Sequence, residues 1–165
     1  MLIRLENDGD HSAIAEVTAR AFAGVEHSDQ TEPEIIARLR ADDALTISLV
    51  AVEKGALIGH VAFSPVTINR AHDGWFGLGP VSVEPGHQVT GIGSALIRTG
   101  LEQLRSRGAA GCVVLGDPAY YSRFGFQRDE GLRYEGAPPE YFMRLNLGAD
   151  ETPRGRGDYA LAFGG

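Results

Sequence analysis

Apolar residues in the first part of the chain recur at two different spacings, one strand-like and one helical. Leu2–Leu5 is predicted to be an opening strand, and Asp10 is placed to cap a helix whose apolar residues follow at helical spacing. Thr31 is placed to cap a second helix, because Pro33 suits its first turn. The polar stretch Gly24–Gln30 between them is predicted to be a loop.

β-branched and apolar residues then dominate two neighbouring segments, Leu45–Glu53 and Leu57–Asn69. Lys54-Gly55 lies between them and is a turn signal, so the two segments are predicted to form a β-hairpin. Trp75–Val83 is a further predicted strand. Gly91–Arg107 has the clearest apolar face at helical spacing and is predicted to be the most regular helix.

The last third of the chain continues with shorter elements. It predicts a strand at Gly111–Leu115, a short helix that begins at Asp117-Pro118, and another strand from Phe126. Tyr141–Leu147 and Asp158–Phe163 alternate in polarity and are predicted to form a final pair of strands. This order predicts an α+β fold with a mixed, mostly antiparallel central sheet and helices on both faces.

Length and composition indicate one domain over residues 1–165, with 43% hydrophobic and 22% charged residues. The net charge is −7 and the basic residues are scattered, so nucleic acid is not an expected partner. The apolar runs are far shorter than the roughly 20 residues that span a bilayer, and the first residues lack the features of a signal peptide. No membrane partner is therefore expected, and the expected location is cytoplasmic.

Cys112 is the only cysteine, which excludes an internal disulfide and a cysteine-based metal cluster. It lies in a β-branched run, so it is predicted to be a small buried hydrophobic residue instead of a catalytic nucleophile. His60 lies alone in a predicted strand and is predicted to be a hydrogen-bonded structural residue. Other His, Asp and Glu residues show no metal-ligand spacing, and no metal is predicted.

A loop with two glycines lies between a predicted strand and the most regular helix. In Gln88–Gly93 the backbone N–H groups and the helix N-terminus offer partial positive charge, which suits an anion. Gly91 and Gly93 let a ligand approach the backbone, while Thr90 and Ser94 add hydroxyl groups. Taken alone, the pattern also fits a tight turn. It lacks the Gly-Lys-Ser/Thr of a phosphate-binding loop and the third glycine of the dinucleotide fingerprint.

The segment Val81–Leu96 resembles the acetyl-CoA signature of the GNAT superfamily of N-acetyltransferases, whose core is Gln or Arg, two residues, Gly, one residue, then Gly or Ala. Tyr120–Phe126 resembles the second motif of that family, Tyr, three residues, Gly and Phe. Leu115–Tyr121 and Pro138–Phe142 resemble the bacterial YhbS-like branch. The resemblance covers nearly the whole chain and implies a GNAT-like sheet with a splay after the fourth strand.

The resemblance also implies the cofactor and the residues that hold it. The loop amides would bind the pyrophosphate of acetyl-CoA and the preceding strand its pantetheine, with CoA released as product. Arg123 could reach the 3′-phosphate or be a plain surface arginine. A family asparagine is absent, and Gly116-Asp117-Pro118 occupies its stretch. The implied cofactor-binding residues are Val81, Ser82, Val83, Gln88, Val89, Thr90, Gly91, Ile92, Gly93, Ser94, Tyr120, Tyr121 and Arg123.

Acetyl transfer by direct attack on a thioester needs a proton donor for the departing thiolate, and the resemblance assigns this role to Tyr121. The alternative for Tyr121 is a packed core aromatic. A strand amide, that of Val83, would stabilise the developing oxyanion. Glu84 is a candidate general base or else a solvated turn residue. Glu26 and Glu32 are candidates for contacting a cationic acceptor, together with neighbouring polar residues of the early loop.

The acceptor is expected to be a primary amine on a small molecule or peptide. Its identity is left open because acceptor pockets are built from variable loops. Two other functions fit the same pattern: a non-catalytic domain that senses acyl-CoA, and an interaction module that pairs through exposed sheet edges. Many GNAT proteins form dimers, so a homodimer is a candidate assembly.

Overall fold

The computed structural model describes residues 1–88 and 90–164, which fall into two compact units. Unit 1 comprises Met1–Phe63 and Gly79–Gly100, and unit 2 comprises Ser64–Leu78 and the chain from Leu101 onward. The boundary between the units cuts through three regular elements. These are β3 (Ala56–Pro65), β5 (Trp75–Val83) and α3 (Ile92–Ser106). The fold is α+β with mostly antiparallel strand pairing, which confirms the predicted class.

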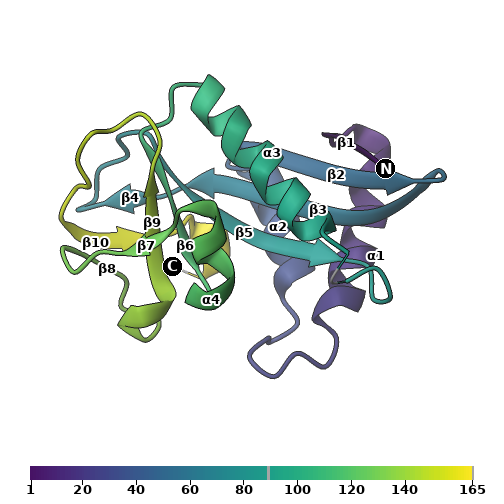
Figure 1. The fold of residues 1–165 in the computed structure, drawn as a ribbon. Helices are drawn as coiled ribbons and strands as arrows, with labels where there is room; N and C mark the ends of the chain where they lie inside the picture. Colours follow the sequence, from purple (N-terminus) through teal and green to yellow (C-terminus); the bar gives the residue numbers. More distant parts are fainter. Residues whose placement is uncertain (89, 165) are drawn as a thin grey trace. The chain divides into compact units, whose positions relative to one another are not determined.

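Unit 1 is built on an antiparallel meander of strands (Figure 1). β1 (Leu2–Leu5) pairs with β2 (Ile47–Glu53), and β2 pairs with β3. The turn residues Lys54 and Gly55 have φ values of +52° and +79°, as a two-residue hairpin loop of the favoured left-handed type requires. This confirms the predicted hairpin.

Two helices cover one face of this meander. α1 (His11–Phe22) and α2 (Glu32–Ala41) contribute Ile14 and Ile36 to a buried cluster with Val50 of β2 (Figure 1). All three side chains are at most 1% exposed, so they form the apolar seam between the helices and the sheet. The predicted helical stripes therefore face the core.

The two side chains that were predicted to cap helices stand at the N-cap positions but make no capping hydrogen bond, so the predicted caps are wrong. Asp10 precedes α1 without capping it, because its carboxylate accepts the backbone N–H of Asn7 at 2.8 Å. Asn7 in turn caps the 3₁₀ turn η1 (Asp8–Asp10). Thr31 makes no cap bond to α2, since its N–H and hydroxyl both donate to Asp29 Oδ1 at 3.1 and 2.5 Å. Nearby hydrogen bonds thus compete with the caps.

The opposite face of the meander packs closely on α3, because a Cβ at Gly59 would lie 3.0 Å from Cδ1 of Leu96 and 3.1 Å from Cγ2 of Ile92. Val50 and His60 are register partners, so the adjacent Gly59 faces away from α1 and α2. A Cβ at Gly100 would lie 2.5 Å from Cζ of Phe63 and closer still to Cε1, and the Phe63 ring is fully buried. Gly100 therefore lets the helix approach the strand.

Replacing Gly100 with alanine is expected to lower the free energy of unfolding by about 2 kcal/mol, because the added methyl group overlaps a buried ring. In an exposed helix the same change would raise stability by about 1 kcal/mol. Urea unfolding of both proteins measures the difference. The cost should shrink when Phe63 is leucine in both members of the pair, and an unchanged cost would contradict the assigned contact.

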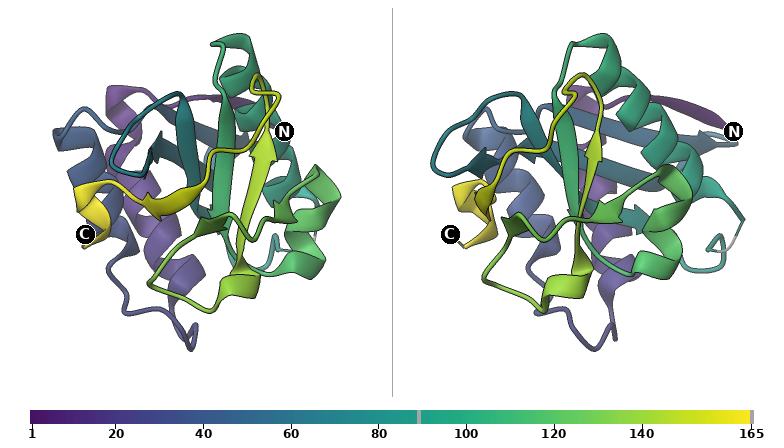
Figure 2. Two further views of the ribbon diagram at one scale, coloured as in Figure 1. Left: turned by 90° about the vertical axis from the view of Figure 1, so that its left-hand side faces the viewer. Right: turned by 60° about the vertical axis from the view of Figure 1, so that its left-hand side comes forward.

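Unit 2 contains the remaining strands in two sheets. The first part of β5 pairs in parallel with β6 (Gly111–Leu115) over Trp75–Leu78, and that pairing ends at Leu78. β6 pairs antiparallel with β9 (Phe142–Asn146), which follows the 3₁₀ turn η3 (Pro139–Tyr141). β9 runs beside β6 in both views of Figure 2. The two-residue strand β7 (Gln127–Arg128) pairs with β9.

A small second sheet corrects the predicted final hairpin. β10 (Gly155–Asp158) pairs antiparallel with β4 (Thr67–Ile68) and parallel with β8 (Leu132–Arg133). The predicted strand Asp158–Phe163 is wrong, because β10 ends at Asp158 and Leu161–Phe163 is a 3₁₀ turn, η4. β10 joins this small sheet and not β9, its predicted partner.

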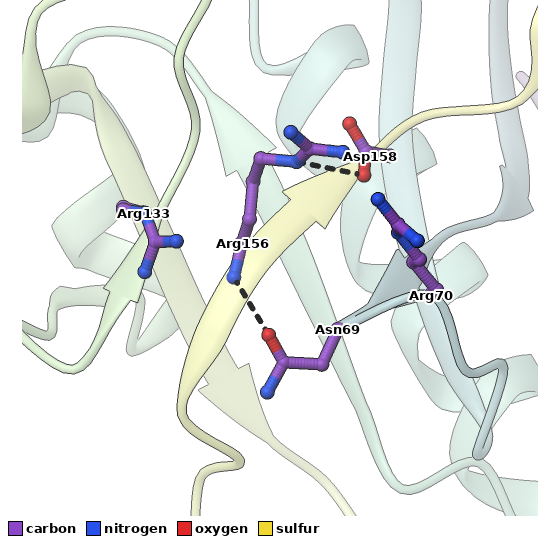
Figure 3. A pocket seen from close by; sticks show the side chains of 5 residues that line it. All are labelled: Asn69, Arg70, Arg133, Arg156 and Asp158. Atoms are coloured by element: carbon purple, nitrogen blue, oxygen red, sulfur yellow. Dashed lines mark hydrogen bonds and ion pairs between the residues drawn. The ribbon is translucent and has the colours of Figure 1, made fainter.

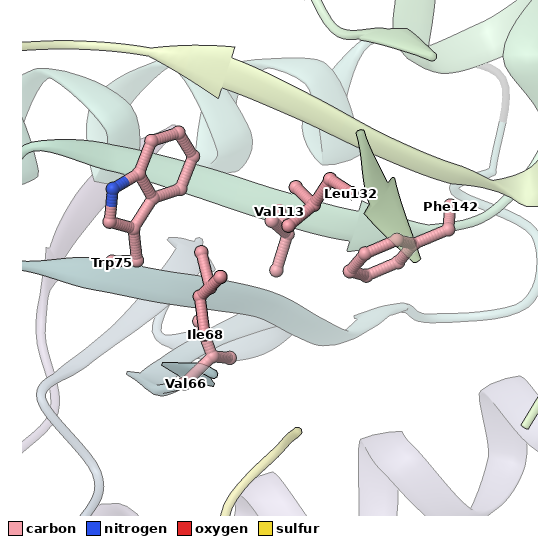
Figure 4. Packing of buried hydrophobic residues seen from close by; sticks show 6 residues of the cluster. All are labelled: Val66, Ile68, Trp75, Val113, Leu132 and Phe142. Carbon is pink, nitrogen blue, oxygen red and sulfur yellow. The ribbon is translucent and has the colours of Figure 1, made fainter. Parts of the chain in front are cut away.

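Aromatic packing explains why the prediction failed there. Tyr159 packs edge-on against Tyr134 with ring centroids 5.3 Å apart, and a Cβ at Gly77 would lie 2.6 Å from Tyr159 Cε1. Its side chain adjoins the buried core of unit 2, so the apolar alternation after Asp158 reflects a turn packed on that core. The core cluster consists of Val66, Ile68, Trp75, Val113, Leu132 and Phe142 (Figure 4).

Candidate active site

The glycine loop of unit 1 leads directly into α3. Gly91 has a φ of +87°, and a Cβ there would meet nothing within 4 Å. The N–H of Ala95 donates to the Gly91 carbonyl at 3.0 Å, so helical hydrogen bonding starts at Gly91. Ile92, Gly93 and Ser94 form the first turn of α3, where backbone N–H groups have no earlier helical carbonyl to bind. This end of a 15-residue helix favours an anion.

Side-chain hydrogen bonds brace the loop from within. Nε2 of Gln88 donates to the Val83 carbonyl at 3.2 Å, and the Thr90 hydroxyl donates to the His87 carbonyl. Val89 lies outside the described residues. Gln88 and Thr90 thus help to hold the loop in its conformation.

The end of β5, which lies in unit 1, alternates in exposure. Val81 and Val83 are half-buried and share one side of the strand, since successive residues point to opposite faces. Ser82 between them is 1% exposed, and its hydroxyl has no hydrogen-bond partner among the described residues. Ser82 can therefore contact a ligand only through its backbone.

The second motif lies in unit 2 on α4 (Pro118–Tyr121) and the 3₁₀ turn η2 (Ser122–Phe124). Asp117 caps α4, because its Oδ1 accepts the N–H of Ala119 at 2.9 Å. This confirms the helix start predicted from Asp117-Pro118. Gly125 ends the segment with a φ of +98°, as the predicted break at this glycine requires.

Tyr121 lies in an aromatic cluster, with its ring centroid 5.0 Å from that of Tyr120 and 6.1 Å from that of Phe126. Burial raises the pKa of Tyr121 to about 12, and Tyr120 and Cys112 add to the shift. The phenol therefore stays protonated at neutral pH. Gly116 makes room for it, because a Cβ there would lie 2.8 Å from Tyr121 Cδ2. Sequence reasoning missed this contact, although Gly116 lies in the stretch where the family asparagine is absent.

Arg123 folds back on its neighbour Tyr120. Its Nε donates to the Tyr120 carbonyl at 2.8 Å, and its Cζ lies 4.3 Å from the centre of the Tyr120 ring. The second contact is a cation–π interaction that fixes the guanidinium group. The predicted bond from Arg123 to a 3′-phosphate stays a prediction.

Comparison with known proteins identifies the family of this chain. The model of the Acetyltransferase (GNAT) family matches residues 12–126. The chain belongs to the GNAT family of acetyltransferases. This membership confirms the family and the enzyme class expected from the sequence.

Several relatives of this GNAT acetyltransferase are similar over most of its length. The uncharacterized N-acetyltransferase YhbS of Escherichia coli strain K12 is 39% identical over 128 residues, which are 77% of this chain and 74% of that protein. A GNAT family acetyltransferase from Brucella melitensis, whose crystal structure contains acetyl-CoA, has 51% sequence identity to this chain. The two structures have a TM-score of 0.88, and the match covers 98% of this chain and 97% of that one. The structure of Escherichia coli YhbS in complex with CoA is 34% identical, with a TM-score of 0.90 over 99% and 91% of the two chains.

Glu84 of this GNAT acetyltransferase is held by a two-point ion pair. Nε and Nη2 of Arg20 lie 2.8 and 2.9 Å from Oε1 and Oε2 of the carboxylate. Both oxygens that would accept a proton are therefore already hydrogen-bonded. Arg20 lies on α1, 64 residues away in sequence, and no sequence signal pointed to it. The role of Glu84 as general base stays a prediction.

The two candidate acceptor residues differ in their surroundings. Glu26 is exposed in the turn after α1. Glu32 is the first residue of α2, and its carboxylate accepts the Ser28 hydroxyl at 2.7 Å. Glu32 thus helps to close the loop, whereas Glu26 faces solvent with its charge available.

The structural readings of Cys112 and His60 are confirmed. Cys112 is fully buried in β6, and burial raises the pKa of its thiol, which opposes formation of a nucleophilic thiolate. His60 is fully buried in β3, with Nε2 at 2.8 Å from Ser48 Oγ. Burial lowers the pKa of His60 to about 4. Its Nδ1 has no hydrogen-bond partner among the described residues.

Ser48 connects His60 to an ion pair. The Ser48 hydroxyl donates to Oε1 of Glu6 at 2.5 Å, and Arg40 donates to both oxygens of Glu6 at 2.9 Å. With Ser48 donating to Glu6, the Nε2 of a neutral His60 serves as donor to Ser48. The network links Glu6, which directly follows β1, to α2, β2 and β3 of unit 1.

Within residues 1–88 and 90–164, no group of three or more His, Cys, Asp or Glu side chains is arranged to hold a metal ion. The helices of the described chain are also all too short or too polar to cross a membrane.

Proposed function

We propose that this protein transfers an acetyl group from acetyl-CoA to a primary amine of a small molecule or peptide within one ternary complex. The observation that carries the proposal is the Gly91 loop, whose positive φ directs the chain into the N-terminal turn of α3. The relatives with bound acetyl-CoA and CoA support the same cofactor here.

Residues 1–165 are proposed to act as one catalytic domain. Domain boundaries normally fall in exposed linkers that few contacts cross. The boundary between the two units instead falls inside β3, β5 and α3. Continuous elements of this kind support a single functional domain.

The cofactor would be held mainly by main-chain groups. The N–H groups of Gly91, Ile92 and Gly93 suit a pyrophosphate, because they lie at the positive end of α3. The backbone of Val81 and Val83 would pair with the pantetheine, in the manner of an added strand. When bound, acetyl-CoA supplies an acyl group activated as a thioester. The remaining proposed contacts are those of Ser82, Gln88, Val89, Thr90, Ser94, Tyr120, Tyr121 and Arg123.

The chain supplies the proton and the charge stabilisation that the transfer needs. Tyr121 donates a proton to the sulfur as its bond to the acetyl carbon breaks, and its raised pKa keeps the phenol protonated until that step. The N–H of Val83 stabilises the oxyanion. Glu84, oriented by Arg20, or a water molecule takes the proton from the amine. Glu26 and Glu32 attract a cationic acceptor.

The cofactor proposal is tested by changing Gly91 to alanine and titrating acetyl-CoA and CoA in a calorimeter. Wild-type protein is expected to bind both with micromolar affinity, and the variant at least about tenfold more weakly, because a Cβ disfavours the required φ and blocks close approach. Gly55→Ala is the matched control. Gly55 has a φ of +79° and also has nothing within 4 Å of an added Cβ, so it carries the same backbone penalty.

Binding that falls only in Gly91→Ala supports the loop as the cofactor site. Absence of binding by the wild-type protein, or equal losses in the two variants, would refute the proposal. Thermal unfolding of both variants checks that each remains folded.

A further inference from the structure

A surface cavity of about 360 Å³ in unit 2 is surrounded by three arginines (Figure 3). We call it the arginine cavity. Two of the arginines come from the paired strands β8 and β10, and the third follows β4. Its lining residues are Asn69, Arg70, Arg133, Arg156 and Asp158.

The positive charge around this cavity is only partly balanced. Nε of Arg156 lies 3.1 Å from Asp158 Oδ2, and its Nη1 lies 3.9 Å from Glu135 Oε2. Among the described residues, neither Arg70 nor Arg133 has an ion-pair partner. An excess of guanidinium groups at one point is unusual in a protein whose net charge is −7.

Strand register places two of these arginines on neighbouring strands as direct partners. Arg133 and Arg156 are direct Cα partners in the parallel pairing of β8 and β10. Directly paired residues project from the same face of a sheet, and like charges in such a pair repel each other. Figure 3 shows both side chains among those that line the cavity, with the guanidinium group of Arg156 turned toward Asp158. A bound anion would balance the charge of Arg133 beside that of Arg156.

The third arginine occupies a position that favours glycine. Asn69 and Arg70 form a two-residue turn closed by hydrogen bonds between Ile68 and Ala71, of 2.9 and 3.2 Å. Their φ values are +52° and +64°, a conformation in which Asn followed by Gly is the favoured pair. Asn69 is locked in place, since its Nδ2 donates to the Arg154 carbonyl at 2.7 Å. The backbone of Arg70 is therefore strained, and its side chain brings a positive charge to the cavity.

We propose that the arginine cavity binds a small oxyanion, the phosphate or carboxylate group of a small molecule. Guanidinium groups match the paired oxygens of these anions and bind them in a two-point geometry. An oxyanion there would accept hydrogen bonds from Arg70 and Arg133 and separate the charges of Arg133 and Arg156. The cavity volume suits a small ligand. The proposal uses residues of unit 2 only and does not depend on the acetyl-CoA loop.

The test is a titration of the full-length protein with inorganic phosphate and, separately, with succinate. Sodium chloride keeps the ionic strength constant, and the arginine Nε–H resonances are followed by NMR. Saturable shifts of Arg70, Arg133 and Arg156 are expected. Arg133→Gln should weaken binding at least about tenfold. Arg128→Gln, which removes the same charge from β7 outside the cavity, should leave it unchanged.

Arg70→Gly gives a second readout, because it removes a charge and the strained φ together. It should weaken anion binding severalfold while raising the melting temperature of the anion-free protein. Preference for phosphate or for succinate would identify the source of the oxyanion, and either supports the site. No saturable binding of either anion, or equal weakening in Arg128→Gln and Arg133→Gln, would overturn the proposal.

Discussion

Replacing Tyr121 with phenylalanine is expected to lower the acetylation rate constant at least about a hundredfold and to leave the affinity for CoA unchanged. The change removes one hydroxyl group and keeps the ring that packs on Tyr120 and Phe126 and fits over Gly116. A pKa raised to about 12 keeps this hydroxyl protonated, so its proton is available to a departing thiolate. Loss of the hydroxyl should therefore affect the chemical step and not binding.

The measurement is CoA release in the presence of an amine chosen by screening the wild-type protein, with CoA affinity determined by calorimetry. Tyr120→Phe is the matched control, because it removes a hydroxyl from the adjacent ring of the same aromatic cluster. Its rate constant at saturating acetyl-CoA should change little, whatever the effect on CoA affinity. An unchanged rate in Tyr121→Phe, or equal losses in the two variants, would rule out the proton-donor role.

Acidification from pH 6.5 to pH 4 is expected to lower the free energy of unfolding by about 3 kcal/mol through His60 alone. Burial lowers the pKa of folded His60 to about 4, against an ordinary value of 6.5. Between these values the unfolded chain binds a proton that the folded chain does not. The free energy of unfolding therefore rises with pH between pH 4 and pH 6.5. Above pH 6.5 the protonation of His60 no longer lowers it.

Glu6 adds to the loss of stability at the acidic end of this pH range. Burial by itself would raise the pKa of Glu6, but hydrogen bonds from Arg40 and Ser48 outweigh it and lower the pKa. The stability that this depressed pKa contributes is present above the ordinary value of 4.5 and is lost as pH falls below it. Protonation of His60 and protonation of Glu6 therefore both lower the stability as pH falls.

Urea unfolding at a series of pH values from 4 to 7.5 measures this dependence. His60→Gln is expected to be less stable at pH 7 but to lose most of the slope between pH 4 and 6.5. His87→Gln removes a histidine whose side chain is 42% exposed, and it should keep the slope. A full slope in His60→Gln would show that other groups cause it.

Sequence patterns predicted the elements that local chemistry determines. Lys54-Gly55 predicted its hairpin because a two-residue turn requires both φ values to be positive. Helix caps failed where a nearby side chain competed, as Asp29 does for Thr31. The strand predicted at Asp158–Phe163 failed because alternating apolar residues also occur where aromatic side chains pack in a turn.

The sequence motifs pointed to the residues of the candidate site, but the contacts that support these residues were not predicted. Gly91 and Tyr121 lie in short motifs that the sequence displays directly. The partner of Glu84 is Arg20, and only the packing of α1 brings the two together. Arg133 and Arg156 meet through a parallel strand pairing that no local pattern specifies. Long-range pairing of this kind lies beyond a single sequence.

The close fit of Gly100 to Phe63 and of Gly116 to Tyr121 also constrains how this sequence can evolve. Each glycine leaves the space that one aromatic ring fills, so the glycine cannot gain a side chain while the ring remains. Descendants that gain a side chain at residue 100 should be those that have already lost bulk at residue 63. Substitutions at these positions are thus expected to accumulate in pairs, and in a fixed order.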